Sequence, residues 1–484
     1  MLKAIPVLAA LLCALAAQVS LAQTSLPVPV AQALAQAGIP ESAVSVYVQE
    51  TDGERPMVSY AADRPLNPAS TIKLVTTYAA LDLLGPAYTW NTEVYASGAL
   101  QRDVLDGNLI LKGYGDPKLT LENFWLLLRG VRARGVREIR GDLVLDRSYF
   151  ARDDYDPARF DGEPTRPYNT PPDALLVNYK AITVQFIPDP DARRVRLMIE
   201  PPLPAVQVVN TLVLSDAPCG DWLARLKIDT QGNGTGARLT LSGTYPRDCG
   251  ERTRSFSLLA HPAYVNALFG ALWKELGGTY TGAVRDEAVD PSARLIATAK
   301  SPSLSEVVRD INKYSNNVMA RQLFLTLGGT AGGAPATLEK ARDALKAWLA
   351  QKDLAAPELV LENGSGLSRI ERISARTMAR LLLDAYRSPV MPELMASLPL
   401  VAVDGTMRKR LGNAGVAGRA HIKTGTLTGV RAIAGYVLDA RNRRNVVVFM
   451  VNHPNAAAAQ GAQDALIKWT YDQAEDCCAR RSLR

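Results

Sequence analysis

Two different hydrophobic periodicities follow one another over residues 27–60. Apolar residues recur every three to four positions over 30–37, which predicts a short helix, and every second position over 43–48, which predicts a strand. An acidic turn at 51–53 leads into a second apolar stretch at 57–60. Two such stretches joined by a turn predict a β-hairpin.

The next segment, residues 70–84, has the spacing of a helix. Gly85 and Pro86 follow it directly and provide a stop. Its apolar positions fall on one side of that helix: Ile72, Val75, Tyr78, Ala79 and Leu83. We therefore expect an amphipathic helix that is largely buried.

The pattern changes between about residues 90 and 290. Short alternating stretches, separated by clusters of Gly, Pro and Asp, predict strands at 92–96, 108–113, 141–146, 181–187, 195–199 and 237–243. Two helices are predicted within this region, at 121–134 and 263–276. The region is rich in strands and contains no cluster of residues that indicates catalysis.

Beyond about residue 300 the helical spacing returns. Helices are predicted at 304–311, 318–327, 337–351 and 374–387, then strands at 420–426, 430–438 and 445–451, and finally a helix at 456–473. We predict an α+β fold, because the elements follow one another as a hairpin, several helices, three more strands and a final helix. Its antiparallel sheet, flanked by helices, takes strands from both ends of the chain.

The strand-rich middle is then an insertion. We expect a domain made of residues 23–95 and 290–484, and an inserted region of two small domains over 96–289. The chain of 484 residues, 47% of them hydrophobic and 21% charged, is long enough for several cores and has an ordinary globular composition.

The N-terminus is expected to direct export. Lys3 precedes an apolar run over 4–19, and Ser20 and Ala22 place small residues before a cleavage site at Gln23. The alternative is an uncleaved anchor helix, but the run is short for a span and Gln18 interrupts it. We expect a cleaved signal peptide over 1–22 and a periplasmic mature protein.

Charge and cysteine content limit the possible partners. The net charge of +7 falls to +6 without residues 1–22, which hold one Lys and no acid. Because basic residues form no run interleaved with aromatics, we expect no binding of nucleic acid. The modest positive charge would suit an anionic surface, so we expect at most peripheral association with a membrane. The three histidines are widely spaced, and the sequence has no H-E-x-x-H or C-x-x-C pattern, so we expect no zinc site and no other metal or cofactor.

The exported location also bears on the cysteines. In an oxidising compartment we expect a bridge between Cys219 and Cys249 that closes a loop. Cys477 and Cys478 are adjacent near a basic terminus, and the sequence leaves their state open.

The first motif with chemical meaning is formed by Ser70 and Lys73. Three positions apart at the start of a helix, the hydroxyl and the ammonium lie on one face. Desolvation would lower the pKa of the Lys amine, which could then take the Ser proton. An N-cap Ser followed by a surface Lys is the ordinary alternative.

A second motif, Ser315 to Asn317, lies between two predicted helices. The hydroxyl of Ser315 and the carboxamide of Asn317 could point into a cleft, relay a proton and hold a substrate amide, although the tripeptide alone is more often a polar turn. Tyr314 and Asn316 form an overlapping Y-x-N pattern, one residue out of register. The chain length and the 245 residues between Ser70 and Ser315 favour the S-x-N register.

The third motif lies on a predicted strand. Lys423, Thr424 and Thr426 would face a ligand that carries a carboxylate, and Gly425 would let a ligand backbone lie close to the strand edge. The alternative is an exposed edge strand that Lys protects from association.

The three motifs together, in the order S-x-x-K, S-x-N and K-T-G, are the signature of the penicillin-recognising serine enzymes. The 245 residues between the first two motifs, against 108 between the last two, leave room for an insertion of about 200 residues. This layout resembles the class C low-molecular-mass penicillin-binding proteins, the D-alanyl-D-alanine carboxypeptidase/endopeptidase family of penicillin-binding protein 4. The resemblance covers essentially the whole mature chain and includes segments 113–117, 141–146, 363–369 and 404–406.

The resemblance implies a penicillin-binding, β-lactamase-like transpeptidase fold and a role for each motif. Ser70 would be the nucleophile that becomes acylated, and Lys73 its base. Ser315 and Asn317 would complete the proton network and bind the substrate amide. Lys423 and Thr424 would bind the carboxylate beside the scissile bond, and the amides of Ser70 and Thr426 would form the oxyanion hole.

The expected function is therefore that of a periplasmic serine D,D-peptidase that acts on peptidoglycan stem peptides and is acylated by β-lactams. It would remove a terminal D-Ala, cut a D-Ala–diaminopimelate cross-link, or do both. Two alternatives stay open: a serine β-lactamase, for which the sequence has no recognisable E-x-x-L-N loop, and a non-catalytic wall-binding protein. The oligomeric state and the role of the insertion are not defined by the sequence.

Overall fold

The computed structural model describes residues 25–152, 155–189 and 191–479. The predicted signal peptide at 1–22 lies outside these residues. Within the described part of the chain, no helix combines the length and the apolar character needed to cross a bilayer.

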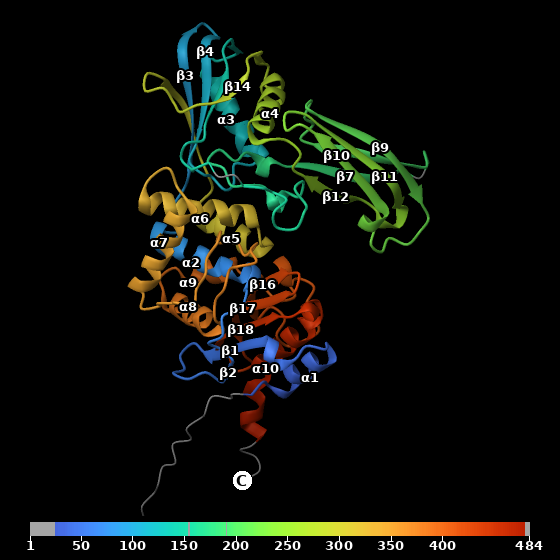
Figure 1. The fold of residues 1–484 in the computed structure, drawn as a ribbon, viewed down its shortest axis with the longest axis vertical. Coiled ribbons are helices and arrows are strands. Elements are labelled where there is room, and N and C mark those ends of the chain that lie inside the picture. The colour runs from blue at the N-terminus through green and yellow to red at the C-terminus, as the bar shows by residue number, and fades with distance from the viewer. Residues whose placement is uncertain (1–24, 153–154, 190, 480–484) are drawn as a thin grey trace, which may run out of the picture.

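One five-stranded antiparallel sheet organises the lower part of the molecule in Figure 1. Its strand order is β16-β17-β18-β1-β2, so the N-terminal hairpin adds to three strands from the C-terminal part. The strands are β1 (Val44–Glu50), β2 (Val58–Tyr60), β16 (Ala420–Leu427), β17 (Val430–Leu438) and β18 (Arg444–Asn452). The predicted α+β fold, with an antiparallel sheet drawn from both ends of the chain, is confirmed.

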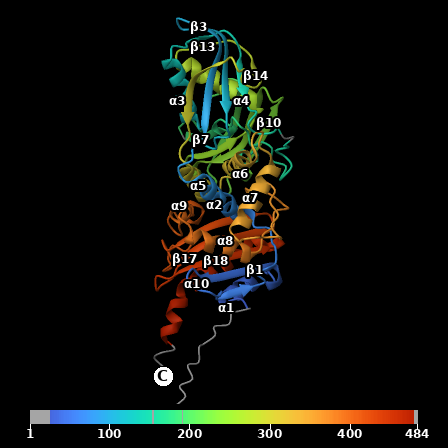
Figure 2. The ribbon, with the colours of Figure 1, turned by 90° about the vertical axis from the view of Figure 1, so that its left-hand side faces the viewer.

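Both faces of this sheet are buried, because successive side chains of its central strands point to opposite sides. Val448 and Met450 of β18 belong to one hydrophobic core, and Phe449 and Val451 to the core on the other side. Helices α1 (Val28–Gln36) and α10 (Gln460–Ala479) cover the second face (Figure 2).

The first face is covered by the helices that carry most of the site. These are α2 (Lys73–Leu84), α5 (Leu304–Tyr314), α6 (Asn317–Gly332), α7 (Leu338–Gln351), α8 (Ala375–Arg387) and α9 (Met391–Ser397). The sequence predicts all of them except α9, which has only seven residues and therefore shows too little periodicity. The predicted helices at 70–84 and 456–473 both begin with a 3-10 turn, at Ala69–Ile72 and Pro454–Ala459.

The chain leaves this part through β3 (Asn91–Gln101) and returns through β15 (Arg294–Lys300), which pair with each other. Both belong to a seven-stranded sheet with β4 (Val104–Gly113), β5 (Glu138–Ile139), β6 (Leu143–Asp146), β13 (Thr279–Tyr280) and β14 (Val284–Asp286). Helices α3 (Leu121–Ala133) and α4 (His261–Glu275) pack against it.

A six-stranded sheet projects to the side in Figure 1. It contains β7 (Ile182–Asp189), β8 (Arg194–Glu200), β9 (Val206–Ser215), β10 (Leu226–Gly232), β11 (Ala237–Pro246) and β12 (Arg252–Phe256). The sequence analysis missed β9, β10 and β12, and β10 shows why, since six of its seven residues are not buried and give no alternation. Buried residues of the two sheets form one continuous hydrophobic core, and the domain boundaries at 23–95, 96–289 and 290–484 stay a prediction.

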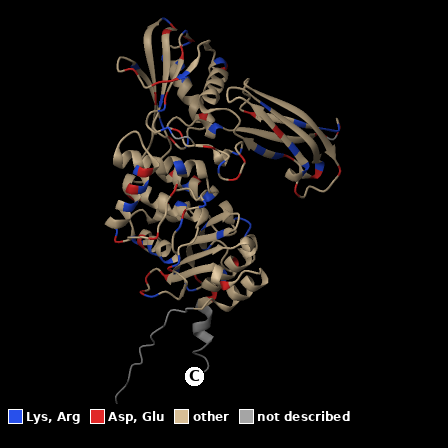
Figure 3. Cartoon of the chain, viewed as in Figure 1, with Lys and Arg blue, Asp and Glu red and all other residues tan. Residues whose placement is uncertain are grey.

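Basic and acidic residues are interspersed over all parts of the molecule in the view of Figure 3. In that view, the basic residues of the described chain are therefore not gathered on one part of the fold.

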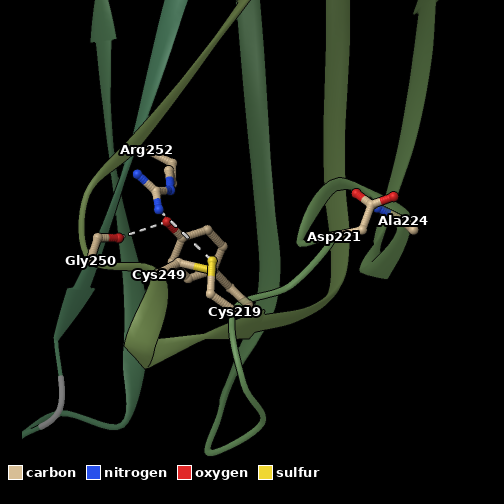
Figure 4. Close-up of a disulfide and its surroundings, with 7 residues drawn as sticks. Cys219, Asp221, Ala224, Cys249, Gly250 and Arg252 are labelled. Carbon is tan, nitrogen blue, oxygen red and sulfur yellow. Dashed lines mark hydrogen bonds between the residues drawn. A yellow bond between two sulfur atoms is a disulfide. The ribbon is translucent and has the colours of Figure 1, made fainter. Parts of the chain in front are cut away.

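A disulfide between Cys219 and Cys249 ties the loop after β9 to the turn before β12, as the sequence analysis expected (Figure 4). The hydroxyl of Tyr245 donates a hydrogen bond to the carbonyl of Gly250 beside it, at 2.7 Å. Helix α10 ends at Ala479, and the side chains of Cys477 and Cys478 lie outside the described ones.

Removing this bridge is expected to destabilise the six-stranded sheet. The two cysteines are 30 residues apart, and closing a loop of that length stabilises a fold by about 3–4 kcal/mol in the chain-entropy account. A Cys219→Ser/Cys249→Ser variant should therefore melt at a lower temperature than the oxidised wild type. Dithiothreitol should lower the melting temperature of the wild type and leave that of the variant unchanged, whereas equal melting temperatures would contradict the expectation.

Candidate active site

The first motif is presented by a tight turn. Ser70 lies within the 3-10 turn Ala69–Ile72, and Lys73 begins α2. Side chains three residues apart eclipse one another in a 3-10 helix, so Ser70 and Lys73 point to the same side. The Asn67 carboxamide holds the turn by accepting from the Ala69 amide at 2.8 Å and donating to the Ser368 carbonyl at 2.9 Å.

The Lys73 amine lies at the centre of the site. Its Nζ is 2.9 Å from Ser70 Oγ and 2.6 Å from Asn317 Oδ1, and it also donates to the Ser365 carbonyl. The Lys73 side chain is fully buried, whereas Ser70 is half-buried and can be reached from outside. The amine therefore faces two obligate acceptors and one hydroxyl.

Burial lowers the pKa of Lys73 well below its ordinary value, and the nearby positive charge of Lys423 lowers it further. Glu371 acts in the opposite direction. A neutral amine has two protons to donate and one lone pair. Its two protons match the carbonyl oxygens of Asn317 and Ser365, which leaves the lone pair for the proton of the Ser70 hydroxyl.

The second motif is a turn between two helices. Ser315 ends α5 in the left-handed conformation, with φ of 57°, and α6 begins two residues later at Asn317. Asn316 is the N-cap of α6, and its side chain accepts from the Met319 amide at 3.0 Å. The Asn316 side chain is therefore used by the helix N-terminus, whereas the side chains of Ser315 and Asn317 contact the two lysines of the site.

This arrangement favours the S-x-N register over Y-x-N. Ser315 Oγ accepts from Lys423 Nζ at 2.9 Å, and Asn317 Oδ1 accepts from Lys73 Nζ. The Tyr314 side chain is 63% exposed and, within the described residues, forms a hydrogen bond to neither lysine.

The third motif lies on β16, at the edge of the five-stranded sheet. Lys423 is fully buried there and donates to Ser315 Oγ and, at 2.8 Å, to the Thr424 carbonyl. Burial lowers the pKa of Lys423 to about 7. Thr424 shares a hydrogen bond of 2.8 Å with Thr406, and Thr426 is exposed at the strand end.

Gly425 has a structural neighbour in addition to the expected ligand. The contact with a ligand backbone stays a prediction, and the structure adds that the nearest neighbour of this glycine is the turn that carries Ser70. A Cβ at position 425 would lie 2.6 Å from the Pro68 carbonyl oxygen and 3.1 Å from the Ser70 amide nitrogen. The absence of a side chain therefore lets the Ser70 amide approach β16.

A Gly425→Ala variant should lose reactivity at Ser70 by about a hundredfold, because a displacement of about 1 Å in a reacting group costs that much. The rate of Ser70 acylation by a chromogenic ester measures it. Gly270→Ala in α4 is the matched control, since a Cβ there meets nothing within 4 Å. An acylation rate equal to that of the control would contradict this reading of Gly425.

Sequence reasoning named the segment 363–369 only as part of the resemblance and missed that this loop supports Lys73. The Asn363 side chain accepts from the amide and hydroxyl of Ser365, and Thr76 Oγ1 donates to the Gly364 carbonyl at 2.7 Å. The buried carboxyl of Glu371 accepts from the amides of Glu362, Asn363 and Gly364. The glycine-rich segment 363–369 was the available signal, but a backbone acceptor for Lys73 has no residue signature.

A half-buried serine, an adjacent buried amine whose pKa is lowered and a second buried lysine on an edge strand define a serine acyl-transfer enzyme of the penicillin-recognising class. The comparisons with known proteins agree. The sequence profile of the D-Ala-D-Ala carboxypeptidase 3 (S13) family matches residues 26–473.

Individual relatives match over most of their length. The D-alanyl-D-alanine carboxypeptidase of Actinomadura sp. (strain R39) is 31% identical over 417 residues, which cover 82% of this chain and 76% of that protein. The D-alanyl-D-alanine carboxypeptidase DacB of Haemophilus influenzae is 27% identical over 386 residues, 79% of this chain and 80% of that protein. The crystal structure of penicillin-binding protein 4 from the same organism superposes with a TM-score of 0.75 at 26% identity, covering 91% of this chain and 99% of that one.

The chain belongs to the D-Ala-D-Ala carboxypeptidase 3 (S13) family. It is thus a serine-type carboxypeptidase, and the resemblance inferred from the three motifs is confirmed. Of the functions considered from the sequence, the peptidase is the one that the family supports.

Proposed function

We propose that this enzyme hydrolyses the D-Ala–D-Ala bond of peptidoglycan stem peptides through an acyl-enzyme on Ser70. The observation that carries the proposal is the set of contacts of Lys73. Burial lowers the pKa of Lys73, and in its neutral form this amine, held by two fixed acceptors 2.9 Å from a half-buried hydroxyl, is suited to remove the hydroxyl proton.

In the first half of the reaction, Ser70 Oγ attacks the carbonyl carbon of the penultimate D-Ala while its proton moves to Lys73 Nζ. The amides of Ser70 and Thr426 hold the negative oxygen that forms. The C–N bond then breaks, and the leaving amine takes a proton that Lys73 gives up through the hydroxyl of Ser315. In the second half, Lys73 takes a proton from the water that attacks the ester carbon, the bond between this carbon and Ser70 Oγ breaks, and Ser70 Oγ regains a proton from Lys73.

Lys423 and Thr424 are proposed to bind the carboxylate next to the scissile bond. A carboxylate lies next to the bond that is cleaved in all three ligands considered: a terminal D-Ala, a D-Ala–diaminopimelate cross-link and a β-lactam. The pair therefore supports carboxypeptidase activity, endopeptidase activity and acylation by β-lactams. Penicillin-binding protein 4 of Haemophilus influenzae has been crystallised with a β-lactam, which supports the last of these.

The periplasm is proposed as the site of action. The family acts on the cell wall, and the sequence of residues 1–22 has the three parts of a cleavable signal peptide.

Release of D-Ala from a soluble peptide that ends in D-Ala–D-Ala tests the proposed function. The purified mature protein should release D-Ala, and a Lys423→Met variant should show a higher KM, because the carboxylate loses its charged partner. A folded wild-type protein that leaves this peptide and a cross-linked dimer intact would contradict the proposal.

The two lysines predict a bell-shaped pH profile. Lys73 must be uncharged to act as a base, so kcat/KM rises with pH through its lowered pKa. Lys423 must be charged to bind a carboxylate, and because its pKa is about 7, kcat/KM falls above that pH. An ester substrate without the carboxylate should lack the alkaline fall, and the same fall with both substrates would contradict this role of Lys423.

A further inference from the structure

A cavity of about 460 Å³ lies beside the S-x-N turn, between that turn and the inserted region. Its volume is in the usual range for sites that hold a small ligand. Ser315 and Asn317 of the candidate active site line this cavity. Thr183 of β7 and Ser255 of β12 line it from the inserted region.

The lining of this cavity has a distinctive chemistry. Three tyrosines, Tyr168, Tyr179 and Tyr314, contribute aromatic faces, and the rest are mainly side chains with amide or hydroxyl groups. None of the described residues that line it carries a charge. Apolar ring faces among neutral hydrogen-bonding groups suit an uncharged, polar, ring-shaped ligand, whereas a carboxylate would find no cation among them.

The backbone of the cavity wall is strained. Asn178 and Tyr179, which line the cavity, and the following Lys180 all have positive φ, at 46°, 53° and 52°, a conformation that strains non-glycine residues. Such strain persists where the surroundings fix it, and it concentrates at functional sites.

Several contacts hold this turn in place. The Asn178 amide donates to the Leu119 carbonyl at 2.8 Å, and the buried Lys180 amine donates to the Leu259 carbonyl at 2.8 Å. The Tyr179 hydroxyl contacts Met319 Sδ of α6 at 3.6 Å. Tyr179 is thus fixed against the helix that begins with Asn317.

The other two tyrosines differ in how they are held. Tyr168 is oriented by a hydrogen bond of 2.8 Å to Asp161 and by the Arg166 guanidinium over its ring. Tyr314 is 63% exposed, and no described residue bonds its hydroxyl. Tyrosine is enriched among the residues that contribute most to binding, and the exposed ring of Tyr314 beside Ser315 is available for such a contact.

We propose that this cavity binds a neutral N-acetylated sugar of the glycan strand, so that the enzyme recognises its stem peptide together with the sugar that bears it. This inference rests on the proposed function. The faces of a pyranose ring pack on tyrosine rings, and its hydroxyl and acetamido groups pair with neutral amides and hydroxyls. Four stem-peptide residues span at most about 14 Å, so the sugar stays within reach of a cavity next to Ser70.

Two substrates that differ only in the sugar test the inference. One is the pentapeptide ending in D-Ala–D-Ala, and the other is the same peptide attached to its N-acetylated disaccharide. The ratio of their kcat/KM values for D-Ala release should favour the disaccharide substrate about tenfold in the wild type. Tyr314→Ala and Tyr168→Ala, on two separate elements, should each bring the ratio toward one.

Tyr60→Ala is the matched control, because Tyr60 is a partly buried tyrosine at the other edge of the sheet, in β2. It should keep the wild-type ratio. A wild-type ratio near one, or tyrosine variants that lose both substrates equally, would overturn the inference and indicate a subsite for the peptide. Acylation of the same samples by benzylpenicillin distinguishes failure of this inference from failure of the proposed function. If benzylpenicillin does not acylate the wild-type protein, the proposed function itself fails.

Discussion

Replacing Ser70 with alanine is expected to lower D-Ala release by about a millionfold, to the background rate. Removal of the nucleophile of a serine hydrolase has an effect of this size, because the remaining groups have no bond-forming partner. The fold should be unaffected, since Ser70 is half-buried and the turn is held by Asn67. Progress curves at high enzyme concentration measure the residual rate.

Ser292→Ala is a suitable control, because it removes a hydroxyl that bonds only within its own loop, to Asp290. It should retain full activity. A Ser70→Ala protein that still released D-Ala at more than a thousandth of the wild-type rate would show that another residue is the nucleophile.

Replacing Lys73 with methionine is expected to slow acylation of Ser70 by about a hundredfold to ten-thousandfold, the usual contribution of a general base. Methionine keeps the length of the side chain but cannot accept a proton. It also leaves the buried acceptors on Asn317 and Ser365 without their donor, which costs about 1–3 kcal/mol of stability for each. The variant should therefore melt earlier as well as react more slowly.

Lys352→Met separates these two effects. It removes an amine that pairs with Asp82 and Asp384 outside the site. It should lower the melting temperature without slowing acylation by benzylpenicillin in a stopped-flow assay. An acylation rate for Lys73→Met within threefold of that of Lys352→Met would contradict the role of Lys73 as the base.

Much of the site follows from the sequence because its parts are local. The proximity of Ser70 and Lys73 depends only on a spacing of three residues in a helical turn, and this spacing survives although the turn is 3-10 rather than α. The S-x-N motif lies between two predicted helices and the K-T-G motif within a predicted strand, so the sequence also places each motif on its structural element. Their meeting in space depends on the resemblance to a known family rather than on periodicity.

The remainder of the site depends on backbone groups and on long-range packing. The Ser365 carbonyl that bonds Lys73 lies 292 residues away in sequence, and any residue type has such a carbonyl. The reason for Gly425 becomes visible only when β16 lies beside the Ser70 turn. Strands such as β10 escape prediction because they are mostly exposed, so no hydrophobic alternation marks them.

The central claim is that Ser70 forms the covalent intermediate. Intact-mass spectrometry of the wild-type protein after a short exposure to benzylpenicillin, followed by peptide mapping, tests it most directly. The account predicts one penicilloyl group per chain, cleared slowly and located on the peptide that contains Ser70. An adduct on a different serine, or rapid loss of penicillin without a lasting adduct, would contradict it.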